Sequence, residues 1–188
     1  MNPQLEAAWQ LHCFFTERQI PYFVIGGIAV QFWGEPRLTR DVDITIVVEP
    51  GEERGVAEDL LQHFPARIEN ALDFALQHRV VLLAIPSLCE VDISLGFPGY
   101  EGQAAQRAVE YDIGDGRVIR LCSAEDLIIH KLVAGRPQDI ADVEGVLLRQ
   151  KGRLDLAYIR HWLSQFAEAL ETPDLLATFE QLRQKVAD

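Results

Sequence analysis

The feature that most constrains the fold is a pair of aspartates inside an apolar run. In the segment DVDITIVV, Asp41 and Asp43 stand one residue apart at the head of a β-branched stretch that closes at a Pro-Gly turn. Such a stretch predicts a buried strand over residues 42–48. Side chains two residues apart in a strand share a face, so both carboxylates project together, while Val42 and Ile44 face the core on the other side.

A third acid, Asp92, interrupts a second apolar strand in the segment CEVDISL. Carboxylates that share a poorly solvated face repel each other, and a divalent cation such as Mg²⁺, which prefers oxygen ligands, relieves that repulsion. If the two strands are neighbours, three carboxylates converge, and three acids can hold two ions about 3.5–4 Å apart for phosphoryl transfer. Asp92 is then either a third ligand or a base for an acceptor hydroxyl. The alternative is a solvated acid at a strand end, which is our interpretation of Glu49 and Glu90.

A glycine pair precedes the aspartates. Gly26 and Gly27 lie where the apolar segment YFVI hands over to a short expected helix, over residues 28–33. The N–H groups and the dipole at a helix start can hold a phosphate, and a Cβ there would keep a triphosphate away from the backbone. The alternative is a simple tight turn.

The remaining pattern predicts an α+β fold. Helices are expected over residues 3–17 and 52–63, and the segments RVVLLAI and CEVDISLG predict an antiparallel pair of strands. The residues Gly-Asp-Gly at 114–116 indicate a hairpin. From Ser123 onward the pattern is helical, beginning with a capping box that Ser123 forms with Asp126. We therefore expect a small mixed β-sheet core flanked by helices over residues 1–122, and a C-terminal helical subdomain over 123–188 packed on it.

Composition limits the partners and the compartment. The 188 residues carry 17 basic and 29 acidic side chains, a net charge of −12, which argues against a grip on extended DNA or RNA and leaves room for a site that binds one nucleotide. The three cysteines, Cys13, Cys89 and Cys122, lack metal-like spacing, which is typical of reduced thiols in the cytosol. The first residues have no leader pattern, and no apolar run approaches the length of a membrane span. A cytoplasmic protein without membrane contact is expected.

Together these elements resemble a known signature. The segment VIGGIAVQFWGEPRLTRDVDITIVV is similar to that of the DNA polymerase beta-like nucleotidyltransferase superfamily: an apolar strand, a Gly-Gly turn, a short helix, Asp-x-Asp and a later third carboxylate. The finer pattern, and the tail SAEDLIIHKLVAGRPQDIADVEGVL, resemble small bacterial members, namely abortive-infection toxin nucleotidyltransferases and antibiotic nucleotidyltransferases. The resemblance covers about residues 20–148 and implies that the expected core has a nucleotidyltransferase fold.

The resemblance implies a nucleotidyltransferase that moves an NMP from an NTP such as ATP to an acceptor hydroxyl. It implies two Mg²⁺ ions as cofactors, with Mn²⁺ as the alternative ion. The implied catalytic and metal-binding residues are Asp41, Asp43 and Asp92. The implied nucleotide-binding residues are Gly26, Gly27, Arg37 and Lys131.

Several of these residues, and their neighbours in the tail, have structural alternatives. Arg37 and Arg40 flank an acidic cluster and are also suited to structural salt bridges, and Lys131 is also suited to a snorkelling position on the surface. We interpret Asp139 as a helix-capping acid and His130 as a packed helix residue. No role is assigned to Arg136 or Asp142.

The acceptor is left open by the sequence. The candidates are the 3′ end of a tRNA, a protein such as the antitoxin of a toxin–antitoxin pair, and a small hydroxylated molecule such as an antibiotic. Two other classes of function also remain: a catalytically inactive nucleotide-binding or interaction module, and a structural protein that binds a divalent metal.

Overall fold

The computed structural model describes residues 2–186, which form two compact units. One unit comprises the chain up to Ile28 together with Leu38–Cys122, and the other comprises Ala29–Arg37 together with the chain from Ser123 onward. The helical unit thus includes a short piece of the N-terminal half as well as the C-terminal part. The packing of the helical part on the core remains a prediction.

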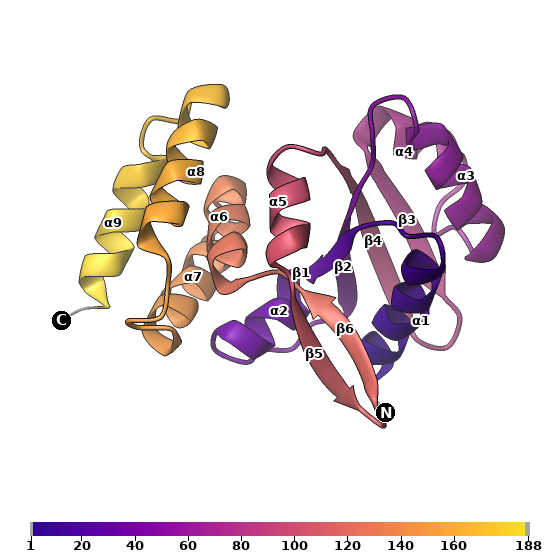
Figure 1. The fold of residues 1–188 in the computed structure, drawn as a ribbon, viewed down its shortest axis with the longest axis horizontal. Helices are drawn as coiled ribbons and strands as arrows, with labels where there is room; N and C mark the ends of the chain where they lie inside the picture. Colours follow the sequence, from indigo (N-terminus) through magenta and orange to yellow (C-terminus); the bar gives the residue numbers. More distant parts are fainter. Residues whose placement is uncertain (1, 187–188) are drawn as a thin grey trace. The chain divides into compact units, whose positions relative to one another are not determined.

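The first unit is built on a six-stranded mixed sheet with the order β3-β4-β2-β1-β6-β5 (Figure 1). β2 is parallel to β4 and β1 is parallel to β6, and the other neighbouring pairs are antiparallel. The strands are β1 (Tyr22–Ile25), β2 (Asp41–Val47), β3 (Val80–Ile85), β4 (Cys89–Gly96), β5 (Val109–Gly114) and β6 (Arg117–Leu121). This confirms the expected α+β class, the antiparallel β3–β4 pair and the β5–β6 hairpin.

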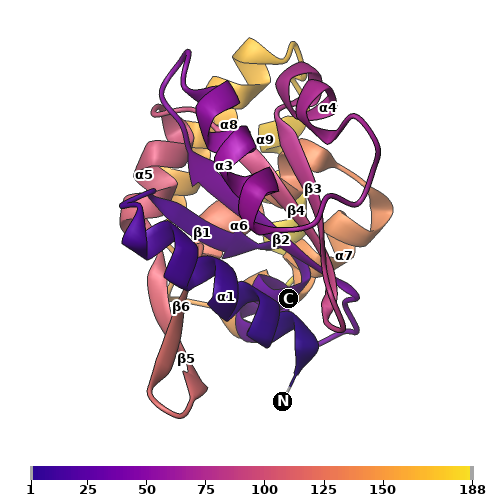
Figure 2. The same ribbon diagram turned by 90° about the vertical axis from the view of Figure 1, so that its right-hand side faces the viewer.

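Helices cover the apolar face of this sheet. α1 (Pro3–Glu17), α3 (Glu53–His63) and α4 (Ala71–His78) contribute their buried residues to one core with the strands (Figure 2). The alternate residues Val42, Ile44 and Ile46 of β2 belong to that core and are at most 1% exposed. Each such side chain contributes about 1.5–3 kcal/mol on burial, so the apolar face fixes which way the strand's polar residues point.

Within this unit, the opposite face of the sheet is only partly covered. α5 (Tyr100–Arg107) lies over its far end, where a Cβ on Gly96 would meet both Glu101 and Thr45. Thr45 is buried there, while Asp41 at the start of the same strand is exposed and Asp43 is half-buried. The polar face of β2 is therefore open at the end that carries the aspartates.

The helical unit contains most of α2 (Gly26–Trp33) and the four C-terminal helices, which are α6 (Ala124–Ala134), α7 (Pro137–Arg149), α8 (Leu156–Ala169) and α9 (Leu175–Lys185). The expected capping box is confirmed: the Ser123 hydroxyl accepts from the Asp126 N–H at 3.1 Å and donates to the Asp126 carboxylate at 2.6 Å. None of the helices in residues 2–186 has the length and apolar character that crossing a membrane requires.

α2 begins at the glycine pair, as expected, and includes both glycines. One local difference from the sequence expectation stands out. α4 was not anticipated. Asn70 at its N-cap is of a residue type that often caps helices, but it lies in the left-handed region and makes no side-chain capping hydrogen bond. Arg79, also left-handed at the C-cap, is not the glycine that usually marks a helix end.

Candidate active site

The register between β2 and β4 brings four acids to one face of the sheet. Asp43 is paired with Asp92, and Asp41 with Glu90, in a parallel ladder. Paired residues of neighbouring strands share a face, so the neighbourhood on which the sequence argument for Asp92 depended is confirmed. Glu90, interpreted from the sequence as a surface acid, lies on the same face. We refer to Asp41, Asp43, Glu90 and Asp92 as the strand acids.

The glycine pair allows the chain to pass close to these acids. Gly26 has φ +65°, and a Cβ placed on it would lie 2.6 Å from the Asp43 Cγ, inside van der Waals contact. A Cβ on Gly27 would lie 2.5 Å from the Cβ of Thr39. The missing side chains therefore leave room for the protein's own Asp43 and Thr39, in addition to any phosphate. They place the first turn of α2, whose N–H groups have no partner within the helix, directly beside Asp43.

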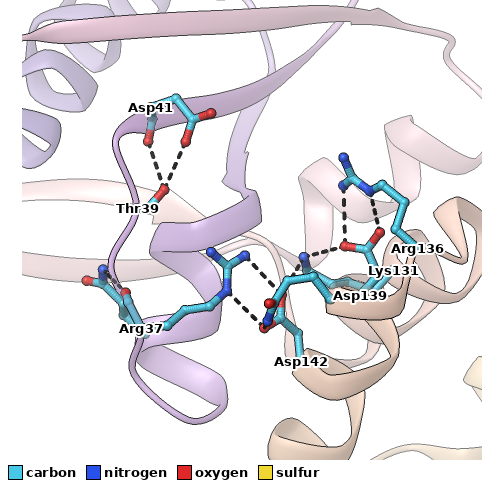
Figure 3. Close-up of polar contacts among 9 residues, drawn as sticks. Arg37, Thr39, Asp41, Lys131, Arg136, Asp139 and Asp142 are labelled. Atoms are coloured by element: carbon cyan, nitrogen blue, oxygen red, sulfur yellow. Dashed lines mark hydrogen bonds and ion pairs between the residues drawn. The ribbon is translucent and has the colours of Figure 1, made fainter.

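Thr39 orients the first aspartate. Its hydroxyl lies 2.9 Å from Asp41 Oδ1 and 3.3 Å from the Asp41 carbonyl oxygen, and donates to them (Figure 3). The Gln4 amide donates in turn to the Thr39 carbonyl at 3.0 Å. Sequence reasoning gave Thr39 no role, although a threonine two residues before an Asp-x-Asp pair is positioned for such a hydrogen bond.

A cation that the sequence did not indicate contacts two of the strand acids. Arg67 Nη1 lies 2.8 Å from Glu90 Oε2 and 2.9 Å from Asp92 Oδ1. The contact with Glu90 is a hydrogen bond, whereas Asp92 Oδ1 is buried and makes no hydrogen bond. Arg67 belongs to a loop segment without a motif, so its place beside the acids follows only from the fold.

The strand acids suit a divalent ion in kind but do not yet enclose one. Asp41, Asp43 and Asp92 are hard oxygen donors on adjacent register positions, which is the donor set that Mg²⁺ prefers. Within residues 2–186, no three acidic, histidine or cysteine side chains are arranged to hold a metal ion together. The carboxylates therefore have to turn toward one another before they share an ion, and the metal remains a prediction.

The helical unit holds a second group of charges. Lys131 Nζ lies 2.7 Å from both Asp139 Oδ1 and Asp142 Oδ2 (Figure 3). Arg37 donates two hydrogen bonds to Asp142, at 2.9 and 3.0 Å, and Arg136 donates two to Asp139, at 2.6 and 3.3 Å. We call these five residues the helical ion network.

The helical ion network keeps its carboxylates charged. Burial acts to raise the pKa of Asp139 and Asp142, but hydrogen bonds from Arg136, Arg37 and Lys131 outweigh it and hold both pKa values below the ordinary range. Lys131 is 6% exposed, so its interpretation as a snorkelling surface residue is wrong. Asp139 lies in the first turn of α7 as expected, but it makes no capping hydrogen bond and instead forms buried ion pairs with Lys131 and Arg136.

The nucleotide-binding roles of Arg37 and Lys131 remain predictions. Arg37 holds Asp142, which is the structural alternative considered for it, and the Lys131 amine is bound between two carboxylates. Either side chain would have to release an acid to take a phosphate. His130, on the same helix as Lys131, is half-buried as expected, and burial lowers its pKa to about 4.

Comparisons with known proteins support the fold. No family model and no curated protein matches the sequence. Among solved structures, an antigenic nucleotidyltransferase-like protein from Paracoccidioides brasiliensis matches with a TM-score of 0.52 and 17% identity, over 93% of this chain and 91% of that one. At this identity the match shows a shared fold, that of a nucleotidyltransferase-like protein.

Two antibiotic-modifying proteins match less closely. The antibiotic-resistance factor ANT(2'')-Ia is 19% identical over 98% of this chain and 92% of that one, with a TM-score of 0.49. The lincosamide antibiotic adenylyltransferase LnuA is 16% identical over 73% of this chain and 92% of that one, with a TM-score of 0.48. Neither likeness is close enough to assign a substrate.

Proposed function

We propose that the protein is a metal-dependent nucleotidyltransferase that transfers an NMP from an NTP to an acceptor hydroxyl and releases pyrophosphate. The observation that carries the proposal is the register of β2 and β4, which sets Asp43 beside Asp92 on an open sheet face next to the first turn of α2. The fold shared with a nucleotidyltransferase-like protein supports it. The sequence resemblance gives the same activity.

Each element of the site has a defined task in this reaction. Gly26 and Gly27 bring the N–H groups of α2 to the triphosphate. Thr39 holds Asp41 in place, and Asp41 and Asp43 bind the Mg²⁺ ions, which supply positive charge to the triphosphate. Asp92 acts as a third ligand or takes the proton of the acceptor hydroxyl, whose oxygen attacks the α-phosphorus in line as the bond to the bridging oxygen of pyrophosphate breaks.

A labelling experiment would identify the class of the acceptor. We suggest incubating the protein with each NTP labelled at the α-phosphate, Mg²⁺, and in separate reactions tRNA, a protein extract, and small hydroxylated amines including aminoglycosides and lincosamides. Label on RNA, on a protein or on a small molecule names the class, and label on a partner protein encoded next to this chain would support a toxin–antitoxin pair. The net charge of −12 favours a compact acceptor over a broad RNA surface.

Variants test the assignment of the acids. Asp41→Asn and Asp43→Asn each lower transfer at least about a hundredfold, because each removes a charged oxygen ligand for the ions that stabilise the transition state. Glu49→Gln, which removes the same charge just beyond the other end of β2, leaves transfer unchanged. Near wild-type transfer in either aspartate variant would refute the metal assignment.

One observation favours a second candidate, a nucleotide-binding module without turnover. Asp92 is engaged by Arg67, and the described residues present no assembled group of metal ligands. For such a module, calorimetry would detect NTP binding while no acceptor in any of the three reactions became labelled.

A further inference from the structure

The position of Arg67 follows from an extra strand-like segment beside β3. Ala66 forms an antiparallel bridge with Leu83, and the Arg67 N–H donates to the Leu82 carbonyl at 2.9 Å. Arg67 is therefore opposite Leu82, which is opposite Asp92, which is opposite Asp43. Residues opposite one another share a face, so Arg67 and the strand acids belong to one row across the sheet.

The sheet surface next to Arg67 is apolar. Leu82 and Ala84 lie on the same face as Asp92 and Glu90, between Arg67 and β4, and both are half-buried. The methylene stem of an arginine covers such a surface while its guanidinium extends beyond it. The side chain of Arg67 is 23% exposed, compared with 36% for Asp92 and 62% for Glu90. The fold thus directs a partly buried cation at the acids, instead of leaving it free on the surface.

The contacts of Arg67 with Glu90 and with Asp92 differ in kind. One nitrogen serves both, with a hydrogen bond to Glu90 and a contact to Asp92 that lacks hydrogen-bond geometry. The more exposed Glu90 is therefore the better hydrogen-bond partner, and Asp92 is held by charge alone. Of these two acids, Asp92 is the one that has a task in the proposed reaction.

We propose that Arg67 is a positioning residue that competes with a divalent cation for Asp92, and that Glu90 holds Arg67 when Asp92 turns to the ion. This inference rests on the proposed function, because it assumes that Asp92 takes part in ion binding. Arg67 lowers the repulsion among the strand acids in the absence of an ion, at the expense of affinity for one. Glu90 is then not an ion ligand. It holds Arg67, which leaves Asp92 free to bind the ion.

The test is Mn²⁺ binding, followed by the electron paramagnetic resonance signal of the free ion at constant ionic strength, with and without an NTP analogue that cannot be transferred. Arg67→Met keeps the stem over Leu82 and removes the charge, and it tightens binding about fivefold, the upper range for a partly exposed ion pair. Glu90→Gln leaves Arg67 committed to Asp92 and weakens binding about fivefold. Arg54→Met, which breaks an exposed pair with Glu58 and removes the same charge, is the control and changes binding less than twofold.

The double variant separates a specific hold from a general effect of charge. If Glu90 acts by holding Arg67, Glu90→Gln has less than a twofold effect once Arg67 is Met. If both residues act only through the field at the site, their effects multiply unchanged, and the proposal is overturned. Should Arg67→Met fail to fold, as judged by circular dichroism, Arg67→Gln provides the same comparison with a polar side chain.

Asp92→Asn distinguishes failure of this inference from failure of the proposed function. If wild type binds Mn²⁺ and Asp92→Asn loses that binding, the ion assignment holds and the Arg67 and Glu90 variants decide the inference by themselves. If wild type binds no Mn²⁺ under either condition, or if Asp92→Asn binds as wild type does, the ion assignment of Asp92 fails and the inference fails with it.

Discussion

The two groups of acids in this protein are compensated in opposite ways. In the helical ion network, two buried aspartates are paired with three cations, Arg37, Lys131 and Arg136. The four strand acids share an exposed or half-exposed face, where Arg67 contacts two of them. The first group is closed within the protein, and the second retains negative charge that an ion or a cationic ligand can take up.

The difference follows from solvation. A buried carboxylate loses several kcal/mol of hydration, so it is stable only where cations and hydrogen bonds replace the water. A carboxylate at an open sheet end keeps its water, so repulsion with its neighbours costs far less and can be retained for binding. Buried acids that are enclosed by cations therefore indicate structure, and several acids that share one solvated face indicate a site.

The largest expected effect comes from removing the cation at the centre of the helical ion network. Lys131→Met should lower the free energy of unfolding by about 3–5 kcal/mol, because it leaves Asp139 and Asp142 buried with less compensation. Urea denaturation measures the change. Lys185→Met, which breaks the exposed pair with Glu144, should cost less than about 1 kcal/mol. Equal effects of the two variants would show that Lys131 does not compensate buried negative charge.

The next effect tests the close approach at the strand acids. Gly26→Ala and Gly135→Ala both place a Cβ at nearly the same backbone angle, φ +65° and φ +63°, so they share the strain of that conformation. Only at Gly26 does the Cβ meet Asp43, whereas at Gly135 the nearest atom is a carbonyl oxygen at 3.6 Å. Gly26→Ala should therefore cost about 1–3 kcal/mol more in thermal or urea unfolding, the usual range for overpacking.

Gly26→Ala also has a functional readout. Because its Cβ displaces Asp43, it should reduce transfer at least about tenfold, whereas Gly135→Ala should not change it. Loss of stability without loss of transfer would show that Asp43 has no task in the reaction.

A more gradual effect is expected from pH. The pKa of His130 is about 4 in the folded protein, because burial disfavours its charged form, against 6.5 for an ordinary histidine. Protonation therefore favours the unfolded chain, and stability that is complete above about pH 6.5 should fall toward pH 4 by at most about 1.4 kcal/mol per pH unit. Urea unfolding across this range should show a smaller dependence on pH for His130→Gln than for the wild type.

The same titration separates the aspartates of the helical ion network from His130. Their pKa values are held below the ordinary 3.8, so the stability they provide is present above that value and is lost as the pH falls through their folded pKa values. A steep loss above pH 6.5 would contradict both assignments.

The smallest effect is expected at the strand acids themselves. Asp41→Asn should leave the free energy of unfolding unchanged or raise it by up to about 1 kcal/mol, because it relieves repulsion on the open face, and added salt should shrink the gain. Chemical denaturation at low and high salt measures it. Destabilisation by several kcal/mol would place Asp41 with the buried, structural acids.

Much of the fold and of the candidate site was predictable, because local patterns report it. The alternation in residues 42–48, the glycine pair and the cap at Ser123 each depend on neighbours in the chain, and the structure has the corresponding strand, helix start and capping box. Arg67 and the pairing of Lys131 with Asp142 were not predictable. In both cases the contact joins separate segments, and no local pattern in either segment indicates it.

The sequence by itself determined that Asp41 and Asp43 share a face, since the two-residue period of a strand requires it. It also determined that the acids follow a glycine turn into a helix. Only the tertiary structure decided that β4 lies parallel to β2 with Asp92 beside Asp43, that Glu90 joins the same face, and that Arg67 reaches it from beyond β3. Side-chain periodicity is a property of one strand, whereas register between strands is set by the packing of the whole apolar face, which no single segment encodes.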